Sequence, residues 1–251
     1  MSNKNLSLIV ATLVLIKFLA IYYTSFNLFG DEAQYWLWSK SLDFGYFSKP
    51  PLLAWFISLH SFIFGDSFFS LKALPTILYF FVSLSFYSLS KNIGLDKKDA
   101  VTCSLLFLFI PAVSFSTFIL STDILLLLFW TLSLNELVKI KSSPAFHRFV
   151  LLGIMLGLAF LSKYAAVYFF ICLALYVVFD KDFRLMFFKN RFNFLISFMC
   201  TFLVILPNII WNLNNGWVTL QHTSDNASLK NIDIDFFRGL VFLVSQVIML
   251  G

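Results

Sequence analysis

The stretch from Gly30 to Pro51 reads GDEAQYWLWSKSLDFGYFSKPP, and it is the one long polar and aromatic insert in an otherwise apolar first third of the chain. It begins with the adjacent carboxylates of Asp31 and Glu32 and ends with Lys49 in front of two prolines. Proline restricts the residue before it to extended geometry. An ammonium group fixed in this way loses little entropy when it binds an anion, so the stretch predicts a site that combines carboxylates with an anion-binding lysine.

The composition around this stretch is that of a membrane protein. The chain has 251 residues, of which 60% are hydrophobic and 12% are charged, whereas a soluble domain carries about 25% charged residues. A chain with so few charged residues cannot cover its surface with hydrophilic side chains, and we expect an integral membrane protein. The net charge of +5 would suggest nucleic acid in a soluble protein. Here it indicates cytoplasmic loops, and no nucleic-acid partner is expected.

The apolar runs predict an all-α fold, a polytopic transmembrane helix bundle with about seven to eight spans. The runs cover residues 6–28, 71–90, 101–120, 124–138, 149–161, 165–179, 194–211 and 236–251. Pro111 predicts a kink in the third run. Residues 52–64 are too few for a span and predict a short helix that lies in the membrane interface. We expect a single domain over residues 1–251, with outer loops at 30–70 and 212–235, truncated at its C-terminus because the last run is short.

The basic residues fix the orientation of this bundle. The inner segments hold Lys4, Lys91, Lys97, Lys98, Lys139, Lys141, Arg148, Lys181, Arg184, Lys189 and Arg191. The outer segments hold Lys40, Lys49, Lys72, Lys163, Lys230 and Arg238. The inner segments thus hold eleven basic residues and the outer segments hold six, in agreement with the positive-inside rule. This topology brings every unusual polar motif to the outer side, where a phosphate is the natural anion for Lys49.

Two further charged residues are expected on that side. Asp123 follows Ser121 and Thr122 at the start of an apolar run, and Lys163 lies between two short runs. About 13 residues rise only roughly 20 Å, less than a ~30 Å bilayer core, so Lys163 is expected to be recessed. Intramembrane ionisable groups are candidates for function. Structural roles stay open, with Asp123 as a helix cap and Asp31 as a cap in a capping box with Gln34.

The second outer loop adds aromatic residues and a histidine. Trp211 and Trp217 fit either interfacial anchors or a site. His222 fits a hydrogen-bonding partner, a metal ligand or a structural residue, and one histidine is a weak metal signal.

Small residues inside the apolar runs have structural explanations. Cys103, Cys172 and Cys200 show no CxxC spacing and predict small core side chains without disulfides. Gly153 and Gly157 form a GxxxG pattern that predicts close packing of two helices.

Taken together, these motifs resemble the polytopic GT-C glycosyltransferases related to protein O-mannosyltransferases and to the bacterial aminoarabinose transferase of lipid A. The matching motifs occur in the family's order along nearly the whole chain. They are Asp31-Glu32 within DEAQYWLWSK, Lys49-Pro50-Pro51, Ser121-Thr122-Asp123, Lys163, and Trp211, Asn212, Trp217 and His222 of the second outer loop.

The resemblance implies a GT-C-like fold and transfer of a sugar, a hexose or pentose, from a polyprenyl-phosphate donor to an acceptor hydroxyl on a lipid, glycan or protein of the cell envelope. Family members are about twice as long. As a hypothesis, Asp31 is the catalytic base, while Glu32 and Asp123 orient the acceptor or the lysines. Lys49 and Lys163 would bind the donor phosphate.

The remaining expectations concern other ligands and the location of the site. Tyr35 and His222 are further candidates for substrate binding. No cofactor is assigned, and a divalent metal is left open. We expect a bacterial inner membrane protein whose site faces the periplasm or the exterior. The alternatives are a non-catalytic membrane fragment or subunit and a secondary transporter, although transporter charges usually lie near the midplane.

Overall fold

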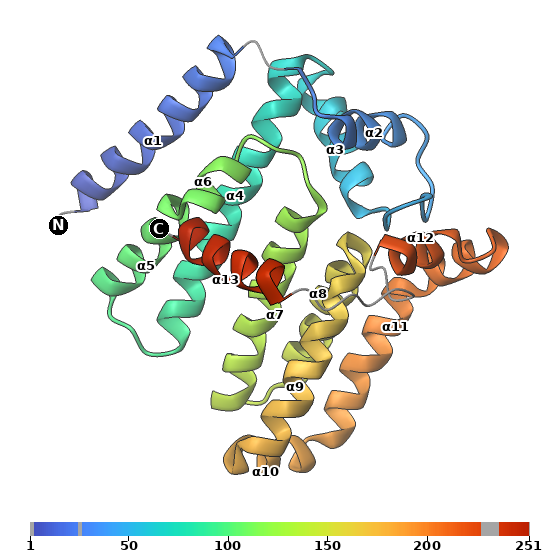
Figure 1. The fold of residues 1–251 in the computed structure, drawn as a ribbon. Coiled ribbons are helices and arrows are strands. Elements are labelled where there is room, and N and C mark those ends of the chain that lie inside the picture. The colour runs from blue at the N-terminus through green and yellow to red at the C-terminus, as the bar shows by residue number, and fades with distance from the viewer. Residues whose placement is uncertain (1–2, 25–26, 227–235, 251) are drawn as a thin grey trace.

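The computed structural model describes residues 3–24, 27–226 and 236–250, and these ranges contain helices and no strand (Figure 1). The helices are α1 (Asn3–Tyr23), α2 (Gly30–Trp38), α3 (Leu52–Phe64), α4 (Phe68–Asn92), α5 (Lys97–Phe109), α6 (Pro111–Ser116), α7 (Thr122–Ser142), α8 (Phe146–Ser162), the 3-10 helix η1 (Tyr164–Ala166), α9 (Val167–Phe179), α10 (Lys181–Lys189), α11 (Arg191–Asn214), α12 (Val218–Asn226) and α13 (Phe236–Leu250). The expected all-α fold is confirmed.

The centre of the molecule is a row of long helices. Helices α4, α7, α8 and α11 pack side by side, and α5 lies against α4 (Figure 1). One buried cluster joins α3, α4 and α7 and includes Ile57, Val82 and Leu125. A second cluster lies toward the other end and includes Phe149 and Phe194. Tyr35 of α2 and Leu52 of α3 belong to the first cluster, so the predicted first outer loop is anchored in this core.

Two helices in the described part of the chain combine enough length with enough apolar character to cross a membrane. They are α4 and α11, with mean hydropathies of 1.5 and 2.2. The pair formed by residues 164–179 and 181–189 is bent by 108° and counts as a third only if it is one span. Helices α1 and α7 have 21 residues each, about 31 Å at 1.5 Å per residue, which is also the reach of a bilayer core. The full number of spans stays a prediction.

The run at 101–120 is broken at its proline. Helix α5 ends at Phe109, and α6 begins with Pro111 in its first position. Proline has no N–H to donate and fits the first turn of a helix, so it starts a new helix here. After Ser116 the chain continues as a short connection to Ser121. The kink expected at Pro111 is therefore a complete break between α5 and α6.

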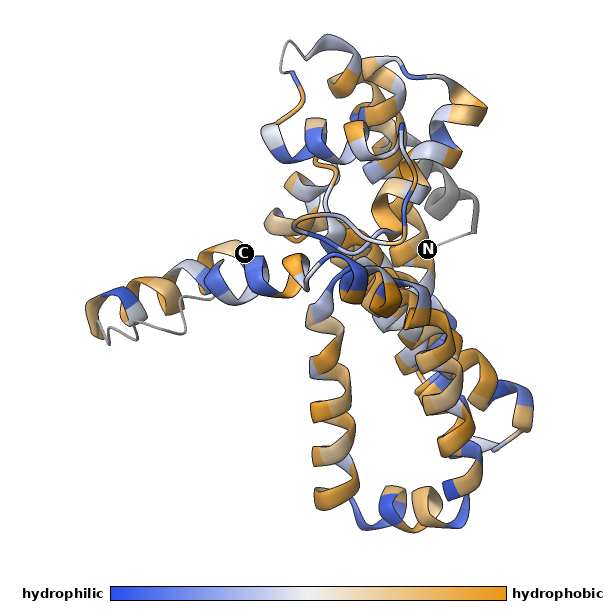
Figure 2. Ribbon diagram, turned by 90° about the vertical axis from the view of Figure 1, so that its right-hand side faces the viewer, coloured by the Kyte–Doolittle hydropathy of each residue, from blue (hydrophilic) through white to orange (hydrophobic). Residues whose placement is uncertain are grey.

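The cysteines do not lie in the core. Cys103 and Cys172 are exposed and Cys200 is partly exposed, so the prediction of buried cysteines was wrong. Figure 2 shows apolar residues along most of the bundle and hydrophilic residues gathered toward its ends. Lipid chains are as apolar as a protein core. An apolar run in a membrane protein therefore does not tell whether a side chain faces protein or lipid.

The GxxxG pattern does mark a close helix contact. The backbones of α8 and α11 approach so closely that a Cβ atom on Gly153 would overlap the Ser197 carbonyl oxygen. Across the same contact, the Ser197 hydroxyl donates to the Phe149 carbonyl at 2.7 Å and the Thr201 hydroxyl donates to the Gly153 carbonyl at 3.0 Å. Small residues and hydroxyl hydrogen bonds hold these two helices together, as in other membrane bundles.

Gly153→Val is expected to lower the free energy of unfolding by about 1–3 kcal/mol or more, because the added atoms force the backbones of α8 and α11 apart. Thermal unfolding in detergent measures the change. Gly239→Ala is the matched control, since nothing lies within 4 Å of a Cβ atom at that helical glycine. Equal stability of Gly153→Val and the control would contradict the packing described here.

Candidate active site

Helix α2 begins in a way that separates the roles of its two carboxylates. Phe29 is the N-cap residue, and its N–H donates to Oε2 of Glu32 at 2.8 Å. The alternative of Asp31 as the cap with Gln34 in the box was therefore wrong, because the helix starts two residues earlier. Asp31 is exposed in the first turn, and no described side chain forms a hydrogen bond or ion pair with it. Its carboxylate is available to a substrate.

Glu32 is a fully buried charge with a complete set of partners. It forms an ion pair of 2.6 Å with Lys72 of α4. The N–H of Leu120, in the connection after α6, donates to its other oxygen, Oε1, at 2.8 Å. Lys72 also donates to the Phe118 carbonyl at 3.3 Å. Glu32 thus joins α2, α4 and this connection. The sequence analysis did not single out Lys72, although a lysine just inside a long apolar helix was the signal for it.

A second ion pair joins α7 to α8. Lys163 follows the last residue of α8, and its ammonium group lies 2.6 Å from Oδ1 of Asp123 in the first turn of α7. The short connection at 143–145 turns the chain back, so the start of α7 meets the end of α8. Ser121 is the N-cap residue of α7, and the structural alternative of Asp123 as the cap was therefore wrong. The pair is partly exposed, at 59% for Asp123 and 36% for Lys163.

Lys49 lies where the loop between α2 and α3 ends. Its carbonyl accepts from the Tyr46 N–H at 3.2 Å. The Tyr46 hydroxyl lies 3.1 Å from the carbonyls of both Trp38 and Ser41, and its ring stacks on Trp38 at 4.7 Å. The loop backbone is therefore fixed. The Lys49 ammonium group has no hydrogen-bond or ion-pair partner among the described side chains, so it is the unpaired cation of this region.

One cavity of about 700 Å³ brings these groups together, within the range of about 300–1,000 Å³ for small-molecule sites. Six of the seven candidate site residues line it. Its lining residues are Phe29, Gly30, Asp31, Glu32, Tyr35, Lys49, Phe115, Ile119, Leu120, Ser121, Thr122, Asp123 and Lys163. Residues far apart in the sequence thus meet at one place, while their individual roles stay predictions.

Tyr35 lies between the acidic groups of the cavity. Burial raises the pKa of its hydroxyl to about 12, and the negative charges of Asp31 and Asp123 add to the shift. A phenol with this pKa stays protonated at neutral pH. Tyr35 therefore presents a neutral hydrogen-bond donor near both carboxylates.

His222 is the candidate that lies apart from the cavity. It belongs to α12, and its ring packs edge to face against Phe47 at 4.9 Å. The expected outer loop at 212–235 is in part helical, since α11 continues to Asn214 and α12 follows. Residues 227–235 lie outside the described part of the chain.

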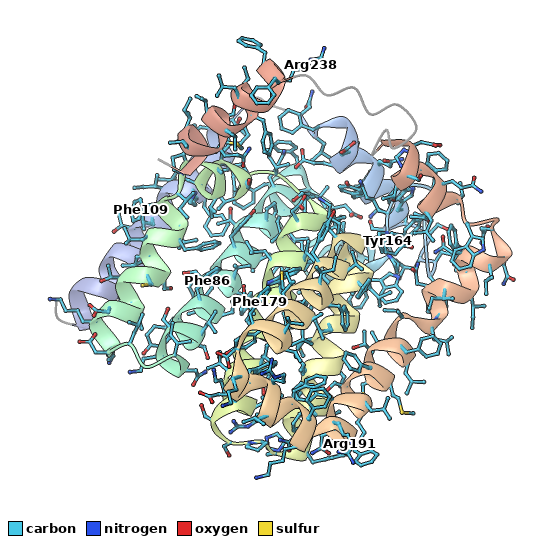
Figure 3. All side chains as sticks on the ribbon, turned by 60° about the horizontal axis from the view of Figure 1, so that its bottom comes forward. Phe86, Phe109, Tyr164, Phe179, Arg191 and Arg238 are labelled. Atoms are coloured by element: carbon cyan, nitrogen blue, oxygen red, sulfur yellow. The ribbon has the colours of Figure 1, made fainter. Side chains whose placement is uncertain are left out.

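The other residues of the second outer motif hold the first outer loop in place. The Trp211 indole donates to Asp43 at 2.7 Å, and its ring packs on Gly45, where a Cβ atom would overlap it. Asn208 donates to the Phe44 carbonyl at 2.6 Å. The Tyr164 hydroxyl, between α8 and α11 in Figure 3, donates to Asn208 at 2.9 Å. These contacts link the residue after Lys163 to the loop that carries Lys49. Asn208, one helical turn before Asn212, was not among the residues predicted from the sequence.

The described side chains do not bring three histidines, cysteines or carboxylates together in a way that could hold a metal ion. The divalent metal that the sequence analysis left open stays untested.

Comparison with known proteins identifies the class to which this helical membrane protein belongs. The model of the family described as dolichyl-phosphate-mannose-protein mannosyltransferase matches residues 48–211. The match covers more than half of the chain, so the chain belongs to this family of membrane glycosyltransferases of the GT-C type.

One curated relative covers the entire chain. It is the lipid A galacturonosyltransferase RgtD of Rhizobium johnstonii (strain DSM 114642 / LMG 32736 / 3841), 29% identical over 252 residues, or 100% of this chain and 52% of the relative. The chain therefore spans about half the length of that protein. No solved structure matches the present chain.

Proposed function

We propose that this chain forms part of a transferase that moves a sugar from a polyprenyl-phosphate donor to an acceptor hydroxyl at the outer face of the membrane. The observation that carries the proposal is the single cavity that combines the unpaired carboxylate of Asp31, the unpaired ammonium group of Lys49 and the Asp123–Lys163 ion pair. Membership of a glycosyltransferase family supports it.

The donor phosphate is bound by lysine side chains. When the bond between the sugar C1 and the phosphate oxygen breaks, its electron pair stays with the phosphate. This leaving group needs its negative charge stabilised more than it needs a proton, and fixed cations do so most strongly in a site with little water. Lys49 binds the phosphate without losing another hydrogen-bond or ion-pair partner, and Lys163 adds a second positive charge from the end of α8.

The acceptor is activated by Asp31. The acceptor oxygen attacks C1 and forms the new glycosidic bond, while its proton passes to the Asp31 carboxylate. The other carboxylates have supporting roles. Asp123 fixes the direction of the Lys163 ammonium group, and Glu32 fixes the start of α2 and therefore the position of Asp31.

The distribution of basic residues supports the placement of the cavity at the outer side of the membrane. The connection from α4 to α5, the connection from α7 to α8, and α10 carry most of the inner lysines and arginines, and they lie at the end of the bundle away from α2 and α3 (Figure 1). The positive-inside rule assigns that end to the cytoplasm. For a bacterial inner membrane, which the Rhizobium relative supports, the cavity then faces the periplasm. The lipid A named for that relative favours an envelope glycolipid as the acceptor.

A transfer assay tests the donor class. Membranes from cells that express the complete gene are given the same radiolabelled sugar either on polyprenyl phosphate or on a nucleotide, with envelope lipids as acceptor. We expect label to reach the acceptor from the lipid-linked donor alone. Transfer directly from the nucleotide sugar, with none from the lipid-linked sugar, would refute the proposed donor.

Lys49→Met is expected to raise the KM for the lipid-linked donor by about 10- to 100-fold, the effect of losing one hydrogen bond from a charged group. Initial rates at varied donor concentration measure it. Lys40→Met is the matched control, because Lys40 lies in the same loop but pairs with Asp66 outside the cavity. The role assigned to Lys49 fails if both variants show the same KM.

A further inference from the structure

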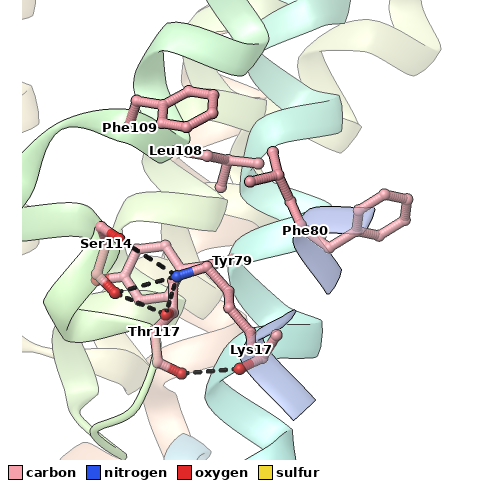
Figure 4. A pocket seen from close by; sticks show the side chains of 9 residues that line it. Lys17, Tyr79, Phe80, Leu108, Phe109, Ser114 and Thr117 are labelled. Atoms are coloured by element: carbon pink, nitrogen blue, oxygen red, sulfur yellow. Dashed lines mark hydrogen bonds between the residues drawn. The ribbon is translucent and has the colours of Figure 1, made fainter. Parts of the chain in front are cut away.

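Lys17 is a charged residue inside α1, and no described carboxylate neutralises it. Its ammonium group donates to the Ser114 carbonyl at 3.2 Å, to the Ser114 hydroxyl at 3.3 Å and to the Thr117 hydroxyl at 2.8 Å (Figure 4). It also lies 4.9 Å from the centre of the Phe118 ring. All three ammonium hydrogens thus have acceptors on or next to α6. A charged lysine within an apolar helix is energetically unfavourable and is a candidate for a functional role.

The acceptors of Lys17 lead to the wall of the cavity. Thr117 is buried, and its carbonyl accepts from the Thr76 hydroxyl of α4 at 3.0 Å. The following residues, Phe118 and Leu120, bond to Lys72 and Glu32. The connection between α6 and α7 is therefore held from α1, α2 and α4 at once. The support from α1 is the set of hydrogen bonds that Lys17 donates to Ser114 and Thr117.

An apolar groove of about 360 Å³ lies between α1 and this connection. Its lining residues are Ala20, Ile21, Thr24, Phe29, Lys72, Phe115, Phe118 and Ile119. Three of them, Phe29, Phe115 and Ile119, also line the cavity of the candidate active site, so the two spaces adjoin. Ile21 stands one helical turn after Lys17, on the same side of α1. The Lys17 contact therefore fixes the two walls of the groove relative to each other.

We infer that Lys17 sets the width of this groove, and that the groove holds the apolar chain of the lipid phosphate whose headgroup enters the cavity. The inference rests on the proposed function for the identity of the lipid. The phosphate of such a donor is drawn to Lys49, and its chain has to leave the charged cavity through an apolar wall. The groove is an apolar space that shares residues with the cavity, and the side chains of Phe29 and Phe115 at the junction are exposed on the protein surface. Lys17 is a positioning residue, since it acts through α1 and α6.

Equilibrium binding separates this role from a merely structural one. The purified complete gene product in detergent is titrated with undecaprenyl phosphate and with geranyl phosphate, which share the headgroup and differ in chain length. Lys17→Met is expected to raise the Kd for undecaprenyl phosphate by about tenfold, because the two walls of the groove are then no longer held at a fixed distance. Binding of geranyl phosphate is expected to change less than binding of undecaprenyl phosphate, because its ten-carbon chain fills only part of the groove. Lys17→Arg keeps the charge and the donors and is expected to restore binding.

A second variant keeps the test valid if Lys17→Met does not fold. Ala20→Phe leaves Lys17 in place and fills the groove from α1, and it is expected to weaken undecaprenyl phosphate binding selectively in the same way. Leu19→Ala, at an exposed position of the same helix, is the control without effect. Equal weakening of both ligands, or of neither, would overturn the inference. The binding result does not depend on turnover, so failure of the transfer assay alone would overturn the proposed function and leave this inference standing.

Discussion

Asp31→Asn is expected to reduce sugar transfer by about a hundredfold to ten-thousandfold, the range for loss of a general base. The amide has nearly the shape of the carboxylate but cannot take the acceptor proton. Because Asp31 has no hydrogen-bond or ion-pair partner among the described residues and is exposed, the substitution removes no internal contact. Folding is therefore expected to be unchanged. Turnover with the lipid-linked donor, measured together with the unfolding temperature, checks both parts of the expectation.

The control for this prediction is Asp66→Asn. Asp66 lies in the connection from α3 to α4, is partly exposed and pairs with Lys40 outside the cavity. It is expected to keep normal turnover. If Asp31→Asn also turned over normally, Asp31 could not be the base, and Asp123 would become the candidate to test next.

Lys72→Met is expected to have the largest effect on stability, lowering the free energy of unfolding by about 3–5 kcal/mol. The substitution leaves the fully buried Glu32 carboxylate without its cation, and an unpaired charge in a buried place is strongly unfavourable. Unfolding in detergent, followed by tryptophan fluorescence, measures the loss.

The double variant Lys72→Met with Glu32→Gln separates the ion pair from its surroundings. It is expected to be more stable than Lys72→Met alone, because the glutamine removes the unpaired charge. Lys91→Met, at an exposed position near the end of α4, is expected to change stability little. A double variant whose loss equals the sum of the two single losses would show that Glu32 and Lys72 are not coupled.

The parts of the fold that local chemistry decides were predictable from the sequence. Helix α3 has the predicted bounds of residues 52–64, because a proline precedes its apolar run and a glycine follows it. Pro111 interrupts its run for the same local reason. The convergence of Asp31, Lys49 and Lys163 followed from placing each motif on one side of the membrane, which needed no knowledge of helix packing.

Features that depend on packing were not predictable. The partner of Glu32 is Lys72, 40 positions later, and only the way α2 sits against α4 selects it. The wrong placement of the cysteines has the same origin, since lipid and protein interior are equally apolar. Within the site, the sequence predicted Asp31 as the base and Glu32 as an orienting residue, but it did not indicate which of the two carboxylates is buried. The structure separates them into one exposed carboxylate and one buried carboxylate, a difference set by the position of each residue in the first turn of α2.

The central claim is that the cavity holding Asp31, Lys49, Asp123 and Lys163 binds the phosphate of a lipid-linked sugar. Photo-crosslinking tests it most directly, with a polyprenyl phosphate that carries a photoreactive group beside the phosphate and with the labelled residues mapped by mass spectrometry. The account predicts label on the cavity lining, at residues 29–32, 35, 49, 115, 119–123 and 163, and loss of this label in Lys49→Met. Label confined to other parts of the protein, and unaffected by that substitution, would contradict the account.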